Sequence, residues 1–278
     1  MTQRQRATAR IGIAGWTYPA WRGDFYPKGL AQRRELEYAS RQLTSIEVNG
    51  TFYAMQKPAT FRHWAEQTPD DFVFSVKGGR FITHMKRLKD VDVAVANYFA
   101  TGLLALEQKL GAVLWQLPPN LPFDAELVDA FLRLLPRDSR QAADLAARHD
   151  ERVPEAVTTT SATRPVRHAV EARHPSFGSA EAVQLMRSHS VALVVADSAR
   201  HWPMLEEVTA DFVYARLHGD KELYASGYSP AALDGWAERV RGWVEQGVDV
   251  LLYFDNDVKG YAPHDARSLL ARLPPSSG

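Results

Sequence analysis

Several short apolar runs of this chain end in charged or amide side chains, and this repetition constrains the fold more than any other feature. The clearest run is DFVYARLHG, residues 211–219, which reads as a buried strand until Arg216 and His218 interrupt its end. The other runs are SIEVN with Glu47 and Asn49, FVFSVK with Lys77, AVLWQLPP with Gln116, HAVEARH with Glu171 and Arg173, and VALVVAD with Asp197. Parallel strands whose carboxyl ends all carry such groups are typical of a (β/α)8 barrel, where these ends build one site.

Two further strands and a set of helical stretches complete the barrel pattern. The strands are RIGIAGW at residues 10–16 and DVLLYFDND at 249–257. Helices are expected at residues 30–43, 91–109, 179–188, 201–209 and from Ser229 to Gly247. Gly111 is expected just beyond the C-cap of the second of these helices. The alternation of strands and helices predicts an α/β fold, a single (β/α)8 TIM-type barrel.

The length of the chain fits one domain of this kind. It has 278 residues, of which 45% are hydrophobic, and such barrels commonly need about 250 residues. We therefore expect a single domain over residues 1–278, with a flexible tail at 1–9. The pattern decays at residues 138–165, where we expect a helix and an exposed insertion between strands four and five.

Charge and cysteine content exclude several classes of function. Lys and Arg together number 33, as do Asp and Glu, so no whole-molecule field draws the protein to nucleic acid or membrane. The chain has no cysteine, which excludes thiol chemistry. It shows neither the apolar core of a secretory signal nor a run approaching the roughly 18 residues of a membrane span. We expect a soluble, cytoplasmic protein; its oligomeric state is not indicated.

The second strand shows which side chains face the barrel interior. Ile46 and Val48 lie on one face and Glu47 and Asn49 on the other. Helices cover the outside of such a barrel, so the polar pair should point inward. A carboxylate there needs a cationic partner, because an unpaired buried charge costs several kcal/mol. Candidate partners are Lys77, Arg173 and Arg216, and the pairing could also be a purely structural ion-pair network.

Two segments near the expected mouth have a functional and a structural interpretation. Residues 78–90, GGRFITHMKRLKD, are the most basic run and could form a lid over an anionic substrate, or a solvated loop. The cluster of Trp16, Tyr18, Trp21 and Tyr26 could floor a substrate cleft or plug the barrel. The residues alone leave both pairs of alternatives open.

These motifs together resemble the YecE-like family, the domain of unknown function 72. The matching stretches are IGIAGWTYPAWRGDFYP, SIEVNGTFY, FVFSVKGGRFITHMKRL, LGAVLWQLPPN, HAVEARHPSF, DFVYARLHG and YFDNDVKGYAPHDA. The resemblance implies a TIM-type barrel but no activity; an analogy with endonucleases that cut at abasic sites rests on fold alone. It implies these family-motif positions: Glu47, Asn49, Lys77, Gln116, Glu171, Arg173, Arg216, His218 and Asn256.

The first hypothesis is a hydrolase or lyase acting on a small anionic, phosphate-bearing substrate, with a nucleic-acid phosphodiester as one candidate. Glu47 or Glu171 would be the general base and His218 the general acid. Arg216 and Lys77 would stabilise developing charge. The remaining substrate-binding candidates are Asn49, Gln116, Arg173, Asn256 and Trp16.

The need for a metal cofactor is a separate question. Glu171, Asp197, His218 and Asp257 could supply ligands for a divalent metal such as Mg, Mn or Zn. No close spacing of the HxH or HExxH kind selects them. The arginines nearby would oppose a dense metal cluster.

Two other classes of function remain open. A carbohydrate isomerase or glycosidase would use the two glutamates as acid and base, with Trp16, Trp21 and Trp115 as sugar platforms. Strands two and five, however, lie nearly opposite in an eight-stranded barrel, which separates these carboxyls. The third class is a non-catalytic protein that binds a small anion or a nucleic-acid end.

Overall fold

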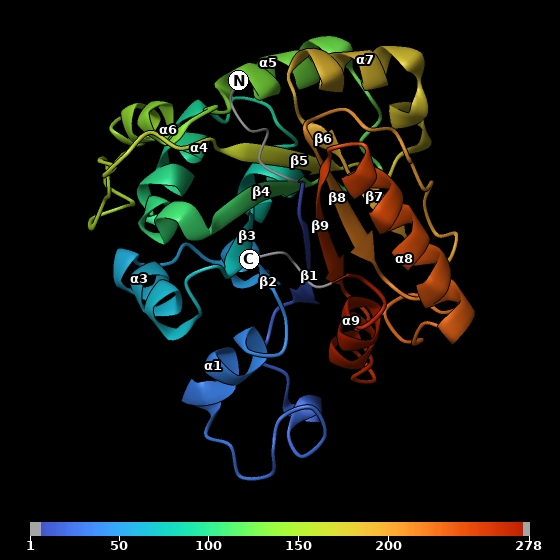
Figure 1. The fold of residues 1–278 in the computed structure, drawn as a ribbon. Coiled ribbons are helices and arrows are strands. Elements are labelled where there is room, and N and C mark those ends of the chain that lie inside the picture. The colour runs from blue at the N-terminus through green and yellow to red at the C-terminus, as the bar shows by residue number, and fades with distance from the viewer. Residues whose placement is uncertain (1–6, 275–278) are drawn as a thin grey trace, which may run out of the picture.

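Nine parallel strands form a nearly closed barrel in the computed structural model, which describes residues 7–274 (Figure 1). The sheet order is β6-β5-β4-β3-β2-β1-β9-β8-β7. The strands are β1 (Ala9–Ala14), β2 (Ser45–Val48), β3 (Val73–Lys77), β4 (Leu110–Gln116), β5 (Arg167–Glu171), β6 (Ala192–Leu193), β7 (Val195–Asp197), β8 (Phe212–Leu217) and β9 (Asp249–Phe254).

One extended segment closes the barrel by changing its partner. β6 and β7 are two halves of the run VALVVAD, separated at Val194. β6 pairs with β5, whereas β7 pairs with β8. The Val194 amide continues the first pairing by donating to the Val170 carbonyl at 3.0 Å. The strands therefore occupy the eight positions of a (β/α)8 barrel, as the strand-end pattern predicted.

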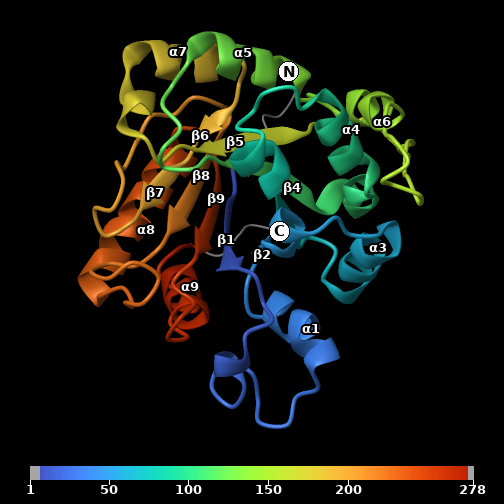
Figure 2. The same cartoon turned by 180° about the vertical axis from the view of Figure 1, so that it is seen from behind.

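Helices surround the strands, as the views from both sides show (Figures 1 and 2). They are α1 (Glu35–Ser40), α2 (Gly50–Tyr53), α3 (Pro58–Gln67), α4 (Asp92–Ala100), α5 (Ala125–Leu134), α6 (Ser139–Ala146), α7 (Ala180–Ser188), α8 (Pro230–Glu245) and α9 (Ala262–Leu270). The N-cap of α8 is Ser229, whose hydroxyl accepts from the Ala232 amide, as expected of Ser-Pro at a helix start. None of the helices in the described part of the chain is long and apolar enough to cross a membrane.

Three predicted helices were wrong in extent or existence. The stretch 30–43 is helical only from Gln32 to Ser40, as a 3-10 segment, Gln32–Arg34, followed by α1. The stretch 91–109 divides: α4 ends at Ala100, and Gly102, with φ 103°, turns the chain into a 3-10 segment, Leu103–Lys109. Gly111 is not a capping residue but part of β4, where a Cβ atom would lie 2.5 Å from Val73 Cγ1. Residues 201–209 form no helix; Pro203 disfavours helical backbone at the residue before it.

Apolar side chains fill two separate layers. A narrow layer inside the barrel combines small and large residues, among them Ala112, Ala169, Phe212 and Tyr253. A larger layer lies between the strands and the helices. Because alternate residues of a strand point to opposite faces, each strand contributes to both layers. The inner layer supports the polar groups at the carboxyl ends of the strands.

The segment predicted as an insertion, residues 138–165, consists of α6 and irregular chain. The Ser139 amide donates to the Arg164 carbonyl at 2.8 Å, and the Val157 amide donates to the Ala100 carbonyl at 2.8 Å, so the irregular part is held to α6 near its end and to α4 in its middle. Residues 1–6 of the predicted tail lie outside the described residues, and Ala9 already begins β1.

Candidate active site at the barrel mouth

Alternation along the strands brings most of the predicted site residues to one end of the barrel interior. In β8, Tyr214, Arg216 and His218 are separated by two positions each and are all fully buried. Glu47 and Glu171 point inward from β2 and β5 and are also fully buried. These strand ends form the mouth of the barrel.

Arg216 is the centre of the mouth. Its Nε and Nη2 atoms donate to Oε2 and Oε1 of Glu47 at 3.0 and 2.8 Å. Its Nη1 atom donates to Glu171 Oε2 at 2.6 Å, and Nη2 also reaches Asp255 Oδ2 at 2.8 Å. One guanidinium thus links carboxylates from three strands, through a bidentate pair and two further charge-assisted bonds. Arg216 is the partner that Glu47 was predicted to need.

Glu47 has no free oxygen in this arrangement. Besides the two bonds from Arg216, its Oε2 atom accepts a hydrogen bond from Tyr214 Oη at 2.7 Å. Burial, and then the charge of Glu47, raise the pKa of Tyr214 well above its usual value, so the phenol stays a donor. These contacts favour a positioning role for Glu47 over the predicted role of general base.

Glu171 is held from both sides by arginines. Its Oε1 atom accepts from Arg173 Nε at 2.9 Å, while Oε2 is taken by Arg216. Burial alone would raise the pKa of Glu171, but Arg173 and Arg216 hold it well below its usual range. Arg173 in turn lies 4.1 Å from the Trp202 ring centroid and donates to Tyr224 Oη at 3.2 Å. Its side chain keeps 12% exposure, so it reaches the outer side of the mouth.

His218 and Asp255 form the most direct acid-base pair. The His218 Nδ1 atom lies 2.9 Å from Asp255 Oδ2, and Nε2 lies 3.4 Å from Glu171 Oε1. Neither ring nitrogen meets hydrogen-bond angles, so these are close polar contacts. The rings of Trp202 and Tyr224 contact the imidazole edge to face, each at 5.3 Å. His218 is therefore covered, and Asp255, with 13% side-chain exposure, is the accessible member.

Two aspartates just beyond β9, Asp255 and Asp257, have pKa values that are shifted in opposite directions. Burial opposes ionisation of Asp255, but Arg216 and His218 lower its pKa to about 2. Burial, followed by the charge of Asp255, raises the pKa of Asp257 well above its usual value. The Asp257 Oδ1 atom is sealed from solvent without a hydrogen-bond partner. The environments of the two groups thus shift their pKa values in opposite directions, which is the arrangement found in acid-base sites.

Lys77 is the cation of the mouth that no carboxylate engages. Among residues 7–274 its Nζ atom has neither a hydrogen bond nor an ion pair, and it lies 4.7 Å from the Phe52 ring centroid. The residue is 8% exposed. Burial, and then the positive charge of Arg216, lower the pKa of Lys77.

A groove of about 510 Å³ is lined in part by Phe52, the residue whose ring Lys77 contacts. Phe52 is thus shared by the lysine and the groove, although Lys77 itself does not line the groove. The exposed apolar side chains of Tyr53, Met55, Phe81 and Met85 lie along it. Arg80 and Arg152 supply charge, and Arg152 also pairs with Asp150 at 3.4 Å. The predicted basic run therefore contributes both apolar and cationic side chains to this groove.

The structure does not bring every predicted residue to the cluster around Arg216. Trp16 packs edge to face on Trp64 at 5.3 Å and lines a separate hollow. Asn256 donates to Asp265 at 2.8 Å and to the Ser226 carbonyl at 2.9 Å, which ties the loop after β8 to α9. Gln116, which ends β4, and Asn49, which follows β2, do share the inward register.

The tryptophans that were predicted to stack on a sugar are not available for that role. Trp21 and Trp115 are fully buried, so neither offers an open face to a sugar. The Arg216 guanidinium also fills the space between Glu47 and Glu171, where a glycosidase must place the reacting carbon. The burial of the two tryptophans and the position of the Arg216 guanidinium both weigh against the carbohydrate hypothesis.

The residues do not fit a divalent metal. In the part of the chain that the structure describes, no group of three or more His, Asp or Glu side chains is arranged to hold one. Asp197, a predicted ligand, accepts from Tyr228 Oη at 3.1 Å. Glu171 and His218 are close together, but the arginines occupy the oxygens of Glu171. We therefore derive no step through a metal.

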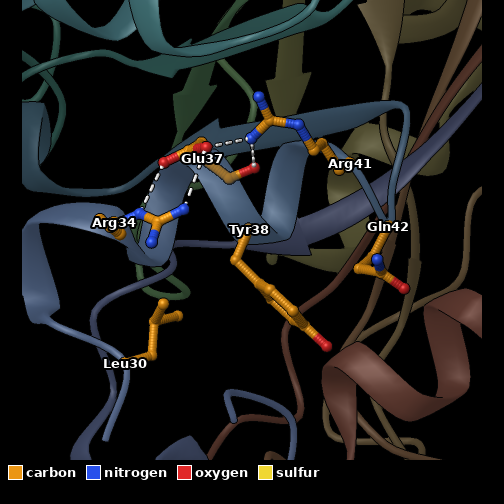
Figure 3. A pocket seen from close by; sticks show the side chains of 6 residues that line it. All are labelled: Leu30, Arg34, Glu37, Tyr38, Arg41 and Gln42. Atoms are coloured by element: carbon orange, nitrogen blue, oxygen red, sulfur yellow. Dashed lines mark hydrogen bonds and ion pairs between the residues drawn. The ribbon is translucent and has the colours of Figure 1, made fainter.

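A second hollow, at α1, is different in kind. It holds about 340 Å³ and is lined by Leu30, Arg34, Glu37, Tyr38, Arg41 and Gln42. Arg34 and Arg41 both reach Glu37, at 3.0 and 2.6 Å (Figure 3). Its charges are exposed and satisfy one another, so the hollow offers little to a ligand.

Backbone strain concentrates in the loops of the mouth. Non-glycine residues with positive φ include Arg87, Leu88 and Asp90 after β3, Ala199 and Arg200 after β7, and Tyr224 after β8. Such conformations cost of order 1 kcal/mol or more each and cluster at functional sites. This observation supports the mouth as the functional end of the barrel.

Sequence reasoning missed several residues of the mouth. Asp255 entered only as part of the last predicted strand, residues 249–257, and the roles of Tyr214, Tyr224 and Phe52 were not anticipated. Counting by two along β9 from Leu251 places Tyr253, Asp255 and Asp257 on one face. That alternation could have identified both aspartates as inward.

Comparison with known sequences gives a family. A model described as "Protein of unknown function DUF72" matches residues 10–277. The UPF0759 protein YecE of Escherichia coli (strain K12) is 33% identical over 127 residues, 45% of this chain and 44% of YecE. The UPF0759 protein YunF of Bacillus subtilis (strain 168) is 30% identical over 131 residues, 44% of each chain. These matches span less than half of either relative, and they confirm the resemblance predicted from the motifs.

Solved structures agree on the fold. A DUF72 family protein from Thermotoga maritima superposes with a TM-score of 0.76 and 25% identity, covering 95% of this chain and 98% of that one. A DUF72 family protein from Enterococcus faecalis V583 gives 0.73 and 17% identity, with 96% and 95% covered. Both likenesses extend over the whole barrel.

Proposed function

Because this chain belongs to the DUF72 family of proteins of unknown function, its activity has to be inferred from the mouth, and we propose a hydrolase or lyase that acts on a phosphate-bearing substrate. The observation that carries this proposal is the groove beside Lys77, which combines apolar side chains with Arg80 and Arg152. An organic phosphate is complementary to this groove, because its apolar part would contact the apolar side chains and its anionic phosphate would contact the arginines.

The distribution of charge in the mouth supports an anionic ligand. Arg216 is neutralised by the carboxylates that surround it, so it cannot also bind a substrate anion. Lys77 and Arg173 lie further out and keep some exposure. Lysine offers a point charge and arginine a planar fork, which together suit a phosphate group.

Proton transfer in this proposal passes through Asp255. It touches both His218 and Arg216 and is the most exposed carboxylate of the cluster. His218 behind it would share the proton, while Arg216 fixes the orientation of Asp255. Glu47 and Glu171 then hold Arg216 in place instead of acting as the base, and Lys77 with Arg173 stabilises the developing charge.

Binding of phenyl phosphate tests the proposal directly. We expect phenyl phosphate to bind more tightly than phenol by isothermal titration calorimetry. Arg80→Ala and Arg152→Ala should each weaken it about tenfold, equivalent to about 1.4 kcal/mol for a lost charged contact. Arg41→Ala, in the α1 hollow, is the matched control and should change nothing.

Turnover decides between a monoester and a diester substrate. p-Nitrophenyl phosphate and bis(p-nitrophenyl) phosphate report the two cases, and the diester stands in for a nucleic-acid backbone. Asp255→Asn should abolish whichever activity is found while phenyl phosphate still binds. Equal binding of phenol and phenyl phosphate, or unchanged binding in both groove variants, would overturn the proposal.

A further inference from the structure

The amine of Lys77 is placed unlike the two arginines of the cluster, Arg173 and Arg216. These arginines occupy the oxygens of Glu47 and Glu171, and Arg216 shares Asp255 with His218. Within the described residues, Lys77 Nζ is therefore left against the Phe52 ring without a polar partner, in a residue that is 8% exposed. A structural lysine in a buried site normally pairs with a carboxylate or with carbonyl groups. Lys109 does so, donating to the carbonyls of Ala65 and Thr68 at 2.6 and 2.8 Å.

We infer that Lys77 is a nucleophile that forms a Schiff base with an aldehyde or ketone bound in the adjacent groove. The inference rests on the proposed function, since the groove cations would hold the anionic group of that carbonyl compound. It narrows the proposal to a lyase whose substrate carries both a phosphate or carboxylate and a carbonyl group.

Three features of the mouth suit this chemistry. A lysine becomes nucleophilic when it is desolvated or lies beside another cation, and Lys77 is buried near Arg216, which together lower its pKa. The Phe52 ring shields one side of the amine and leads into the groove. Burial and the charge of Asp255 raise the pKa of the Asp257 carboxyl group well above its usual value, and its buried Oδ1 atom has no hydrogen-bond partner among the described residues, so we assign it as the proton donor.

The step balances without any further reactant. The Lys77 ammonium passes a proton to a carboxylate, for which Asp255 is the accessible group. The free amine then bonds to the carbonyl carbon as the carbon–oxygen π bond breaks, and the proton that the nitrogen loses moves to the oxygen to give a neutral carbinolamine. Protonation of that hydroxyl, from Asp257 or from the proton held on Asp255, breaks the carbon–oxygen bond. Water leaves and the nitrogen retains the positive charge, so an ammonium ion and a carbonyl give an iminium ion and water.

The test is reductive trapping on the intact protein. The protein is incubated with sodium cyanoborohydride and one of three probes: glyceraldehyde 3-phosphate, dihydroxyacetone phosphate or pyruvate. Intact mass and peptide mapping then locate the adduct. We expect a single adduct on Lys77 at neutral pH, absent from Lys77→Arg, which keeps the charge but cannot form the imine. Lys259→Arg, at an exposed ion-paired lysine, should leave the adduct unchanged.

The outcomes separate this inference from the proposed function. Adducts spread over exposed lysines, with Lys77 unmodified in the native protein, would overturn the inference even if phenyl phosphate binds. An adduct on Lys77 with all three probes, but no binding of phenyl phosphate, would support the nucleophile and overturn the phosphate proposal. Because the decisive readout is the site of modification in the wild-type protein, it does not depend on a variant folding correctly.

Discussion

At the scale of single residues, the mouth depends on Arg216 and the carboxylates around it. The alternation along β2 was enough to predict that Glu47 points inward. The sequence offered Lys77, Arg173 and Arg216 as equal partners, and only the register of the closed barrel decides among them. Pairing between residues 169 positions apart in the chain is a property of that register. The side chains that point into the barrel could therefore be predicted from the sequence, whereas the ion pairs among them could not.

Removal of the charge of Glu47 tests whether this network holds the barrel together. Glu47→Gln leaves part of the Arg216 charge uncompensated in a fully buried site. We expect the free energy of unfolding in urea to fall by about 3 to 5 kcal/mol, the usual cost of breaking a buried pair. Glu155→Gln, at the exposed pair with Lys57, is the control and should remain near wild type. Equal stability of all three proteins would contradict the network.

His168 gives the stability a pH dependence of its own. It is buried, accepts a hydrogen bond from Trp115 Nε1 at Nδ1, and its Nε2 lies 2.7 Å from the Pro136 carbonyl. Burial lowers the pKa of His168 to about 4. The unfolded chain binds a proton near pH 6.5 and the folded chain does not, so the stabilisation is present above that pH and is lost towards pH 4.

This contribution can be isolated by substitution. His168→Gln removes the titrating group, so the stability of the variant should depend less on pH between about 6.5 and 4. The difference in slope should not exceed about 1.4 kcal/mol per pH unit, the value for one proton. Urea unfolding at several pH values measures it. Parallel curves for both proteins would show that His168 is not neutral in the fold.

At the scale of elements, the strands were easier to predict than the helices. Strand ends carried a repeated polar signal, while the helix boundaries depended on single glycines. Gly102 breaks the helical stretch through its positive φ, and Gly111 serves close packing of β4 against β3. The end of the helix was predicted at Gly111, and Gly102 did not enter that prediction.

Close approach of β1 to β2 gives a prediction for this scale. A Cβ atom at Gly12 would lie 2.0 Å from the Ser45 carbonyl oxygen, so Gly12→Ala must displace one strand. We expect a loss of at least about 1–3 kcal/mol in the free energy of unfolding, as for overpacked cores. Gly79→Ala, where nothing lies within 4 Å, should be tolerated. Unfolding in guanidinium chloride compares them, and equal stability would refute the close packing.

At the scale of the whole molecule, the repeated pattern of strands and helices is enough to predict the barrel. The function depends on which side chains the barrel brings together at the carboxyl ends of its strands. A neutral chain without cysteine or a marked motif spacing gave few chemical constraints. The fold adds such constraints by placing at one mouth a lysine without a polar partner among residues 7–274, a covered histidine and two aspartates with opposite pKa shifts. The groove was not predictable, because its lining comes from α2, the loop after β3, α4 and residue Arg152.

The most direct test is a crystal structure of the protein with phenyl phosphate. The account predicts that the phosphate contacts at least two of Lys77, Arg173, Arg80 and Arg152, with the ring in the groove between Tyr53 and Phe81. Binding of the ligand only in the α1 hollow or beside Trp16 would contradict the account. The account would also be contradicted if the mouth held no ligand in crystals grown at a phenyl phosphate concentration that saturates the protein in solution.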